Sequence, residues 1–290
     1  MPLTRYFLFL QRRTTASLIN AVSLPCAMHL DQHFMIDERL LGRIVAAAAL
    51  TPDDVVLEAG PGRGALTQHL LAAKAHVLAI EMDPVLVETL QRRFAKELAS
   101  GQLELVGGNV LEDAFGLSFT KSVSNLPYAI SEPFLKLLLR ANPVRAVLVV
   151  SDSFAENLTS GQTKLSLLAN AQYELTLAEI IAPHAFSPSP RTDSALIVLN
   201  ARESLSEEQL VLVELSRQLD KKAYNALVEA LCRVRRETKR AAKAEVFAAA
   251  SAGPPDEVAA HDHVLEQNLD RLSNPGFLRL LKLVRTILGK

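Results

Sequence analysis

The chain has 290 residues, of which 49% are hydrophobic and 22% are charged. This composition excludes a mostly disordered or collagen-like chain, and the length suits one large domain or a domain with a small appendage. Lys and Arg total 31 against 32 Asp and Glu, so the net charge is -1 and any nucleic-acid surface has to be local. The two cysteines, Cys26 and Cys232, lack metal-binding spacing, and no apolar run approaches the ~20 residues that span a bilayer.

Residues 1–30 contain three arginines and no carboxylate, which is typical of a mitochondrial transit peptide. We favour two simpler interpretations: a disordered tail, or an upstream start codon with Met28 as the true start, because Met28 directly precedes the first organised segment. We therefore expect a cytoplasmic protein. A mitochondrial location is the alternative if residues 1–30 are a targeting segment.

Strands and helices alternate from Asp53 to about Leu199. Short runs, most of them apolar, predict strands at residues 55–59, 76–81, 103–106, 121–124, 146–150, 173–181 and 195–199. Helices are predicted at residues 65–73, from Pro84 onwards and at 132–139. This alternation predicts a doubly wound, mainly parallel α/β sheet that binds ligands at the carboxyl ends of its strands.

The pattern changes after about Asn200, where helical spacing begins at Leu210 and no convincing strand follows. A Ser-Ala-Gly-Pro-Pro sequence interrupts the pattern at residues 251–255, and Phe277 and Val284 belong to a final amphipathic helix. Residues 201–290 are therefore predicted to form a small all-helical domain.

A glycine-rich loop, Gly60-Pro61-Gly62-Arg63-Gly64, joins the first predicted strand to a helix. Glycines let the backbone approach a ligand closely, although such loops are often only structural. The next strand ends in Glu81, about 20 residues further on, where a carboxylate typically accepts hydrogen bonds from ribose hydroxyls. A dinucleotide and a nucleoside both fit. Pro61 and the missing helix-opening glycine favour a nucleoside without pyrophosphate, such as S-adenosylmethionine.

The segment Asn125-Leu126-Pro127-Tyr128 lies between a strand and a helix, at the ligand edge of the predicted sheet. By itself it would be typical of a turn. Beside the glycine loop and Glu81, it predicts methyl transfer to an exocyclic amine. The Asn oxygen and a backbone carbonyl can accept both N–H bonds of the amine while the aromatic ring stacks on the base. Such positioning would supply most of the catalysis.

Five segments, in this order, resemble the ribosomal RNA adenine dimethyltransferases of the small subunit (KsgA-type): QHFMID at 32–37, LEAGPG at 57–62, EMD at 81–83, NLPY at 125–128 and FSPSPRTDSA at 186–195. The resemblance implies a Rossmann-like class I methyltransferase domain at 31–200 and a helical RNA-binding domain at 201–290. It also implies S-adenosylmethionine as cofactor and N6-dimethylation of adenosines in small-subunit rRNA, supporting ribosome biogenesis. The expected partner is this rRNA or a pre-ribosomal particle. We expect no metal, no membrane partner and a monomer.

The resemblance also assigns residues to the site. The cofactor-binding set would be His33, Met35, Gly60, Gly62, Glu81, Met82, Asn109 and Asn125. The catalytic set would be Asn125, Leu126, Pro127, Tyr128 and Phe186, with Tyr128 and Phe186 on either side of the flipped adenine.

Two segments depart from the family. Asn109 stands where the family usually has an Asp that accepts a hydrogen bond from the adenine amine of the cofactor; the neutral amide predicts weaker binding. Residues 151–158 keep the apolar positions of a family segment but lack its Lys, Glu and Arg. These changes motivate an alternative function, a catalytically weak rRNA-binding assembly or transcription factor. A related large-subunit rRNA adenine methylase is a third hypothesis.

A local basic surface is predicted near residue 240. Residues 31–200 carry 13 basic and 19 acidic residues, so the helical region would have to supply much of the positive field. We predict that a single helix, with only Glu237 opposing its charges, presents Arg233, Arg235, Arg236, Lys239, Arg240 and Lys243 to RNA. Arg233, Arg236 and Arg240 would share one face, although such a charge run is usually only a solvated surface.

Overall fold

The computed structural model describes residues 33–114 and 116–289, which pack as one compact unit. The predicted targeting or disordered segment, Met28 as a start site and Cys26 lie outside these residues. Within them, no helix is long and apolar enough to cross a membrane.

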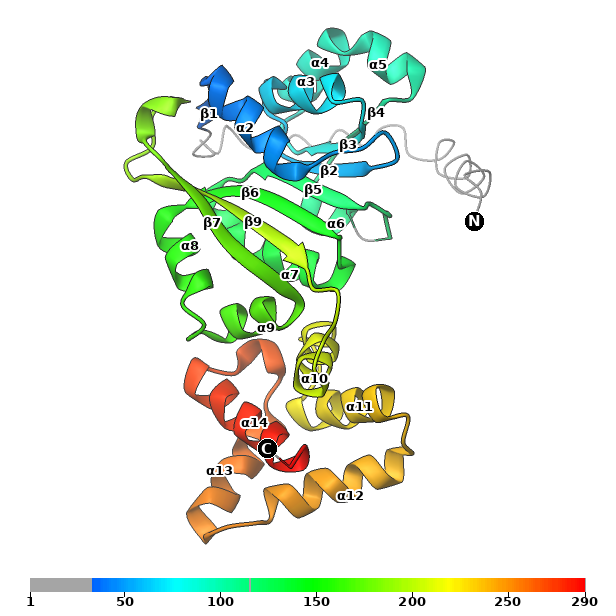
Figure 1. Cartoon of the computed structure of the whole chain (residues 1–290), viewed down its shortest axis with the longest axis vertical. Helices are drawn as coiled ribbons and strands as arrows, with labels where there is room; N and C mark the ends of the chain where they lie inside the picture. Colours follow the sequence, from blue (N-terminus) through cyan, green and yellow to red (C-terminus); the bar gives the residue numbers. More distant parts are fainter. Residues whose placement is uncertain (1–32, 115, 290) are drawn as a thin grey trace. The chain divides into compact units, whose positions relative to one another are not determined.

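A seven-stranded sheet with the order β4-β3-β2-β5-β6-β9-β7 organises the first two thirds of the chain (Figure 1). Its parallel strands are β2 (Val55–Ala59), β3 (His76–Glu81), β4 (Leu103–Gly107), β5 (Lys121–Asn125) and β6 (Arg145–Ser151). Two antiparallel strands, β7 (Tyr173–Ile181) and β9 (Ser194–Ala201), complete one edge. The sequence predicted all seven, and the mainly parallel sheet is confirmed.

Side chains alternate between the two faces of the sheet. Val56 packs in one apolar cluster and its neighbour Leu57 in the other; Val77 and Leu78 divide in the same way. Because both faces are buried, these strands are continuous apolar runs rather than alternating ones, which is why the sequence signal was clear.

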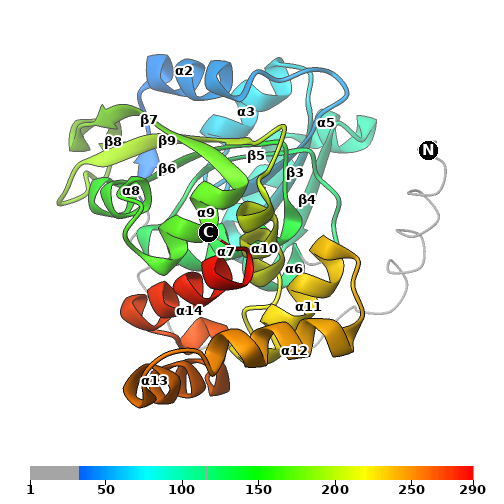
Figure 2. The same cartoon turned by 60° about the horizontal axis from the view of Figure 1, so that its bottom comes forward.

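Helices cover both faces (Figures 1 and 2). The cluster on one face includes residues of α2 (Glu38–Ala48), α3 (Ala65–Ala72), α4 (Pro84–Arg93) and α5 (Ala95–Ser100). The cluster on the other includes residues of α6 (Val110–Asp113), α7 (Ser131–Ala141), α8 (Asp152–Thr159) and α9 (Lys164–Gln172). The altered segment 151–158 therefore keeps its helix, α8, which Ser151 caps through its side chain.

After β9 the described chain forms helices and no further named strand. They are α10 (Glu207–Ser216), α11 (Ala223–Arg235), α12 (Lys239–Ala250), α13 (Pro255–Glu266), the short 3-10 helix η3 (Leu269–Arg271) and α14 (Asn274–Ile287). The predicted helical region and its break near residues 251–255 are thus observed. Of these helices, α10 lies against α7 and α9, and α14 lies against α9 (Figure 2). The apolar side chains of the C-terminal helices continue the cluster on that face of the sheet.

Lys164, the first residue of α9, fastens the C-terminal helices to the sheet region. Its Nζ donates to the backbone oxygens of Leu269 at 3.0 Å, Asp270 at 2.7 Å and Leu272 at 3.0 Å. Burial is the main cause that lowers the pKa of this amine. All three donors of the ammonium are used, which fixes η3 relative to α9.

A second, two-stranded sheet joins distant parts of the chain. β1 (Phe34–Met35) pairs antiparallel with β8 (Phe186–Ser187), so that Met35 lies opposite Phe186. Two residues are too few to give a periodic signal, and the sequence did not predict either strand. This ribbon brings the first and last of the five family-like segments together.

Candidate active site

The predicted loops meet because β3, β2 and β5 are neighbours with parallel directions. The glycine loop follows β2, Met82 follows β3, and the tetrad begins at the end of β5. Parallel strands place their carboxyl ends at one edge of a sheet, so these segments border a common region.

The glycine loop has a backbone that other residues adopt only with strain. Gly60, Gly62 and Gly64 have φ angles of 65°, 59° and 82°. A Cβ added at Gly60 would meet nothing within 4 Å, whereas one at Gly62 would lie 3.1 Å from the Phe34 ring. The surface above Gly60 therefore stays open, and Phe34, with the Arg63 guanidinium 4.5 Å from its ring centre, covers Gly62.

Glu81 holds the glycine loop against the end of β3. Its Oε2 accepts from the Gly62 amide at 2.9 Å, and its Oε1 accepts from the Asp83 amide at 3.0 Å. The side chain is buried, and each carboxylate oxygen keeps capacity for another donor. This geometry leaves acceptors for the hydroxyls that the sequence assigned to it.

Glu58 is a buried acid in β2, two positions before Gly60. It is 1% exposed, and its Oε2 has no hydrogen-bond partner within the described chain. Burial, opposed by the nearby Thr67 hydroxyl and reinforced by the charge of Glu81, raises the pKa of Glu58 to about 8. The protonated, uncharged acid is therefore the stable form at neutral pH.

Asn109 is the N-cap residue of α6. Its Oδ1 accepts from the Leu111 amide at 3.1 Å, and its Nδ2 donates to Glu112 Oε1 at 3.2 Å. The first bond is a helix cap that an aspartate could also make. The second requires the amide, so the departure from the family pattern is matched by a contact of its own.

Asn125 is tied to the N-terminal segment. Its Nδ2 donates to the His33 backbone oxygen at 3.1 Å, while His33 Nδ1 lies 2.8 Å from the Pro188 oxygen. Since Nδ2 is the donor, Oδ1 remains the acceptor of this side chain. The structure thus brings together Asn125, His33 and the loop after Phe186.

Tyr128 is fixed from two sides. Its hydroxyl lies 2.6 Å from Ser194 Oγ, and its ring centre lies 6.2 Å from that of His33 at an interplanar angle of 33°. Ser194 is fully buried at the start of β9. The sequence included Ser194 in a family-like segment and gave it no role; its contact with Tyr128 emerges only from the fold.

The remaining predicted residues differ in exposure. Met82 is 50% exposed, whereas Met35 and Leu126 are buried, and Pro127 is half-buried. Phe186 is 3% exposed and packs in the apolar cluster that also contains Met35. A base could lie against Phe186 only if this ring left the core, so the two-ring sandwich stays a prediction.

Serine hydroxyls bridge β2 and β5, a feature that sequence reasoning missed. Ser124 Oγ accepts from the Ala59 amide at 2.9 Å, and Ser122 Oγ donates to the Leu57 oxygen at 3.2 Å. Both serines are completely buried, so these bonds satisfy groups that water cannot reach. These bonds fix the start of the glycine loop relative to Asn125. The sequence signal that could have indicated them is the Ser-Val-Ser pattern within an otherwise buried strand.

The basic cluster is not on one helix, which corrects the prediction. α11 ends at Arg235, Arg236 adopts a left-handed conformation with φ 54°, and Thr238 caps α12 through the Ala241 amide. The face predicted for Arg233, Arg236 and Arg240 therefore does not exist, because a turn separates these residues.

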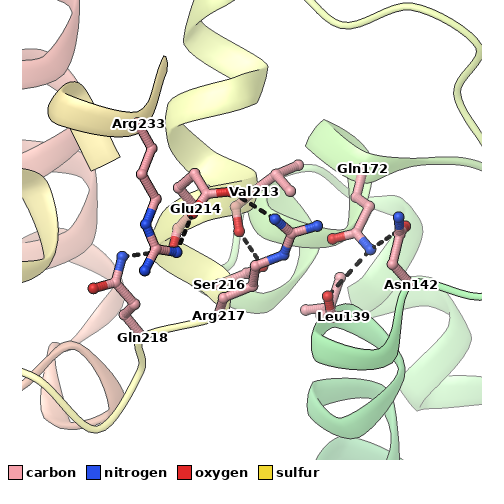
Figure 3. A network of polar contacts seen from close by, with 9 residues as sticks. All are labelled: Leu139, Asn142, Gln172, Val213, Glu214, Ser216, Arg217, Gln218 and Arg233. Carbon is pink, nitrogen blue, oxygen red and sulfur yellow. Dashed lines mark hydrogen bonds and ion pairs between the residues drawn. The ribbon is translucent and has the colours of Figure 1, made fainter. Parts of the chain in front are cut away.

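Two arginines of the cluster are engaged in ion pairs within the fold, so Glu237 is not the only opposing charge. Arg233 lies 2.8 Å from Glu214, which also binds Arg217 at 2.6 Å (Figure 3). Arg235 binds Glu207 and Glu245 at 2.7 and 2.6 Å. These contacts join α10, α11 and α12. Arg233 and Arg235 therefore have a structural role that requires no contact with RNA.

The geometry of the site fits a nucleoside cofactor. Gly60 leaves space for a ligand against the backbone, and Glu81 presents acceptors to hydroxyls. No cluster of three or more metal-binding side chains occurs in the described parts of the chain.

The chain is similar in sequence to ribosomal RNA methyltransferases. A family model for ribosomal RNA adenine dimethylase matches residues 27–242. A "Probable ribosomal RNA small subunit methyltransferase A" of Methanosarcina barkeri is 40% identical over 177 residues, 59% of this chain and 60% of that protein. The protein of the same description from Thermococcus onnurineus is 39% identical, over 66% of this chain and 70% of that protein. The first of these alignments thus spans less than two thirds of the relative.

Solved structures agree on the fold. A 23S rRNA methyltransferase, ErmE, superposes with a TM-score of 0.56 at 23% identity, covering 86% of this chain and 98% of that one. A dimethyladenosine transferase from Plasmodium falciparum gives 0.56 at 24% identity, covering 88% and 98%. The class I methyltransferase fold predicted from the sequence is therefore confirmed. With the glycine loop, Glu81 and the tetrad at one edge of its sheet, the chain belongs to the ribosomal RNA adenine dimethylase family.

Proposed function

We propose that this protein transfers methyl groups from S-adenosylmethionine to N6 of adenosines in small-subunit rRNA, two per adenosine, and so supports ribosome biogenesis. The observation that carries the proposal is the placement of the tetrad. Asn125 and Tyr128 lie at the end of β5, next to the β2 loop, with their side chains fixed by His33 and Ser194. The family membership and the description of the relatives support the same reaction.

The cofactor would lie against Gly60 and Glu81, with Met82 against its base, and Gly62 would position the Glu81 carboxylate through its amide. When bound, it supplies an electrophilic methyl on a sulfonium. The protein binds and orients the acceptor. Asn125 Oδ1 and the backbone oxygens of the tetrad accept the N–H bonds of the adenine amine, which directs its lone pair at the methyl carbon. For each methyl gained, an N–C bond would form as the sulfonium C–S bond breaks to leave a neutral thioether, and the nitrogen would release one proton to solvent water. Positioning therefore carries the catalysis.

Mass spectrometry of rRNA nucleosides tests the proposal. Purified protein is incubated separately with undermethylated small-subunit rRNA and large-subunit rRNA, each with isotopically labelled cofactor, and dimethyladenosine should appear in the small-subunit rRNA. Binding without methylation would support the alternative, a catalytically weak assembly or transcription factor motivated by Asn109 and α8. Methylation of large-subunit rRNA alone would indicate the third hypothesis.

Replacing Asn109 with aspartate is expected to tighten cofactor binding by about 1 kcal/mol, the usual difference between charged and neutral hydrogen bonds. The new carboxylate would face Glu112, the present partner of the amide. Calorimetry should therefore compare Asn109→Asp, Glu112→Gln and the double variant. The double variant relieves the repulsion and should bind most tightly. Equal or weaker binding in both Asn109→Asp proteins would show that the site depends on the amide.

The Tyr128–Ser194 hydrogen bond is expected to support turnover by orienting the Tyr128 ring. Tyr128→Phe and Ser194→Ala should each slow methyl transfer by roughly five- to tenfold, equivalent to one hydrogen bond. The double variant should be no slower than either single variant, because all three lack the same contact. Ser187→Ala, at an exposed serine of β8, is the control. Additive losses in the double variant would contradict this role.

A further inference from the structure

Helix α12 presents a basic face with an exposed aromatic ring. Arg240, Lys243 and Phe247 are spaced by three and four residues and so lie on one side of the helix, which we call the α12 face. Phe247 is 70% exposed, the highest fraction among the exposed large hydrophobic residues of the described chain. Arg240 and Lys243 are exposed beside it.

The opposite side of α12 accounts for the stability of the helix without Phe247. Ala242, Val246 and Ala250 are buried in the cluster shared with the other C-terminal helices. Thr238 caps the first turn through the Ala241 amide at 3.2 Å. Phe247 therefore adds nothing to the core, and its ring is free to contact a partner.

The charges of the α12 face are not compensated within the described residues. Three neighbouring carboxylates already have cationic partners: Glu245 binds Arg235, Glu214 binds Arg233, and Glu229 binds Lys221 at 2.7 Å. A fourth, Glu237, forms no ion pair in the described structure, and its Oε1 has no hydrogen-bond partner there. Neither Arg240 nor Lys243 has an ion pair in the described structure, and the flanking Arg236 and Lys239 have none there either. The fold thus pairs two of the six residues of the predicted basic cluster with carboxylates and leaves the other four exposed.

We propose that the α12 face binds a single-stranded segment of the RNA substrate, with Phe247 stacked on an unpaired base and Arg240 and Lys243 on adjacent phosphates. Successive turns of the helix are about 5.4 Å apart, so the ring and the two cations form a row along the helix axis. A row of cations beside an aromatic ring matches the alternation of phosphates and bases in a single strand. The proposal rests on the proposed function, which makes RNA the substrate, and it assigns RNA contact to α12 rather than to Arg233 and Arg235.

The absence of tryptophan from the chain allows a direct test of stacking. Phe247→Trp introduces a single indole whose fluorescence reports only on this position. Small-subunit rRNA transcript should quench this emission, because a stacked base contacts the ring. Polyphosphate carries phosphate charges but no bases. When the variant binds as many phosphate charges from polyphosphate as from the transcript, polyphosphate should leave the emission nearly unchanged. Equal quenching by both polyanions, or none by the transcript when it is bound, would overturn the proposal.

Affinity measurements over a range of salt concentrations separate the ring from the cations. Phe247→Ala should weaken binding of the transcript by about five- to 100-fold with an unchanged salt slope, and Phe247→Trp should restore it. The double variant Arg240→Ala, Lys243→Ala should lower the log–log salt slope by up to ~0.7 for each lost contact. Arg92→Ala with Lys96→Ala, two exposed cations of α4 and α5, is the matched control and should leave the slope unchanged.

Nucleoside mass spectrometry of the wild-type protein distinguishes failure of this proposal from failure of the proposed function. If the wild type methylates rRNA and the RNA affinities of the wild type and the α12 variants have the same salt slope, the proposed role of the α12 face is wrong and the enzyme assignment stands. Normal quenching and slopes without methylation would support the α12 face and contradict the enzyme assignment. Loss of both RNA binding and methylation in the wild type would contradict both.

Discussion

Replacing Asn125 with alanine is expected to lower the rate of methyl transfer by roughly 10²–10³, the usual cost of losing one preorganised hydrogen-bonding group. The substitution removes the acceptor oxygen proposed for the adenine amine. It also removes the bond from Nδ2 to the His33 oxygen, which ties the N-terminal segment to the end of β5. The fold should persist, because Asn125 is only half-buried at the end of its strand.

Single-turnover methylation of rRNA measures this effect, with thermal unfolding as the check on folding. Asn125→Asp separates the two roles, because a carboxylate keeps an acceptor and cannot donate to His33. If the acceptor matters most, Asn125→Asp should retain more activity than Asn125→Ala. Near-normal turnover of Asn125→Ala would exclude the assigned chemistry, and equal losses in both variants would assign the effect to the His33 contact.

Stability is expected to fall as the pH rises from about 5 to about 9, and Glu58→Gln should remove much of this dependence. Burial raises the pKa of Glu58 from 4.5 to about 8 in the native state. Between these values the native protein holds a proton that the unfolded chain has released. The free energy of unfolding therefore decreases by about 1.4 kcal/mol for each pH unit in this window.

The sign follows from the two limits. Below the unfolded pKa both states are protonated, and the native state does not bear the cost of a buried charge. Above the native pKa both are ionised, and the native state bears the full cost of a buried carboxylate, on the order of 4–5 kcal/mol. Glutamine has nearly the same shape and never ionises, so at high pH the variant should be more stable than the wild type.

Urea denaturation across this pH range tests the prediction without cofactor. Glu203→Gln, at an exposed carboxylate after β9, is the control and should follow the wild-type curve. Parallel curves for the wild type and Glu58→Gln would show that Glu58 does not titrate with folding. Added S-adenosylmethionine should raise all curves by mass action, which keeps cofactor effects apart from those of the proton.

The sequence by itself determined the elements whose signal is local. All seven strands of the large sheet were predicted, and the signal was strongest for β2, β3 and β6, which are apolar runs buried on both faces. Helical spacing predicted the change of architecture after β9, and glycines with an acid about 20 residues later predicted the cofactor edge. A local signal was also overlooked: Thr238 is a helix cap, and it marks the break that divides the basic cluster between α11 and α12.

Only the tertiary structure decided which distant side chains meet. Asn125 and His33 are 92 positions apart, and Tyr128 and Ser194 are 66 apart, so neither contact leaves a periodic trace in the sequence. The same holds for charge, because Arg233 is neutralised by a carboxylate from the preceding helix while Arg240 remains unpaired in the described structure. Periodicity records how an element buries its own face, whereas these pairings depend on how separate elements pack, and that is settled by the fold as a whole.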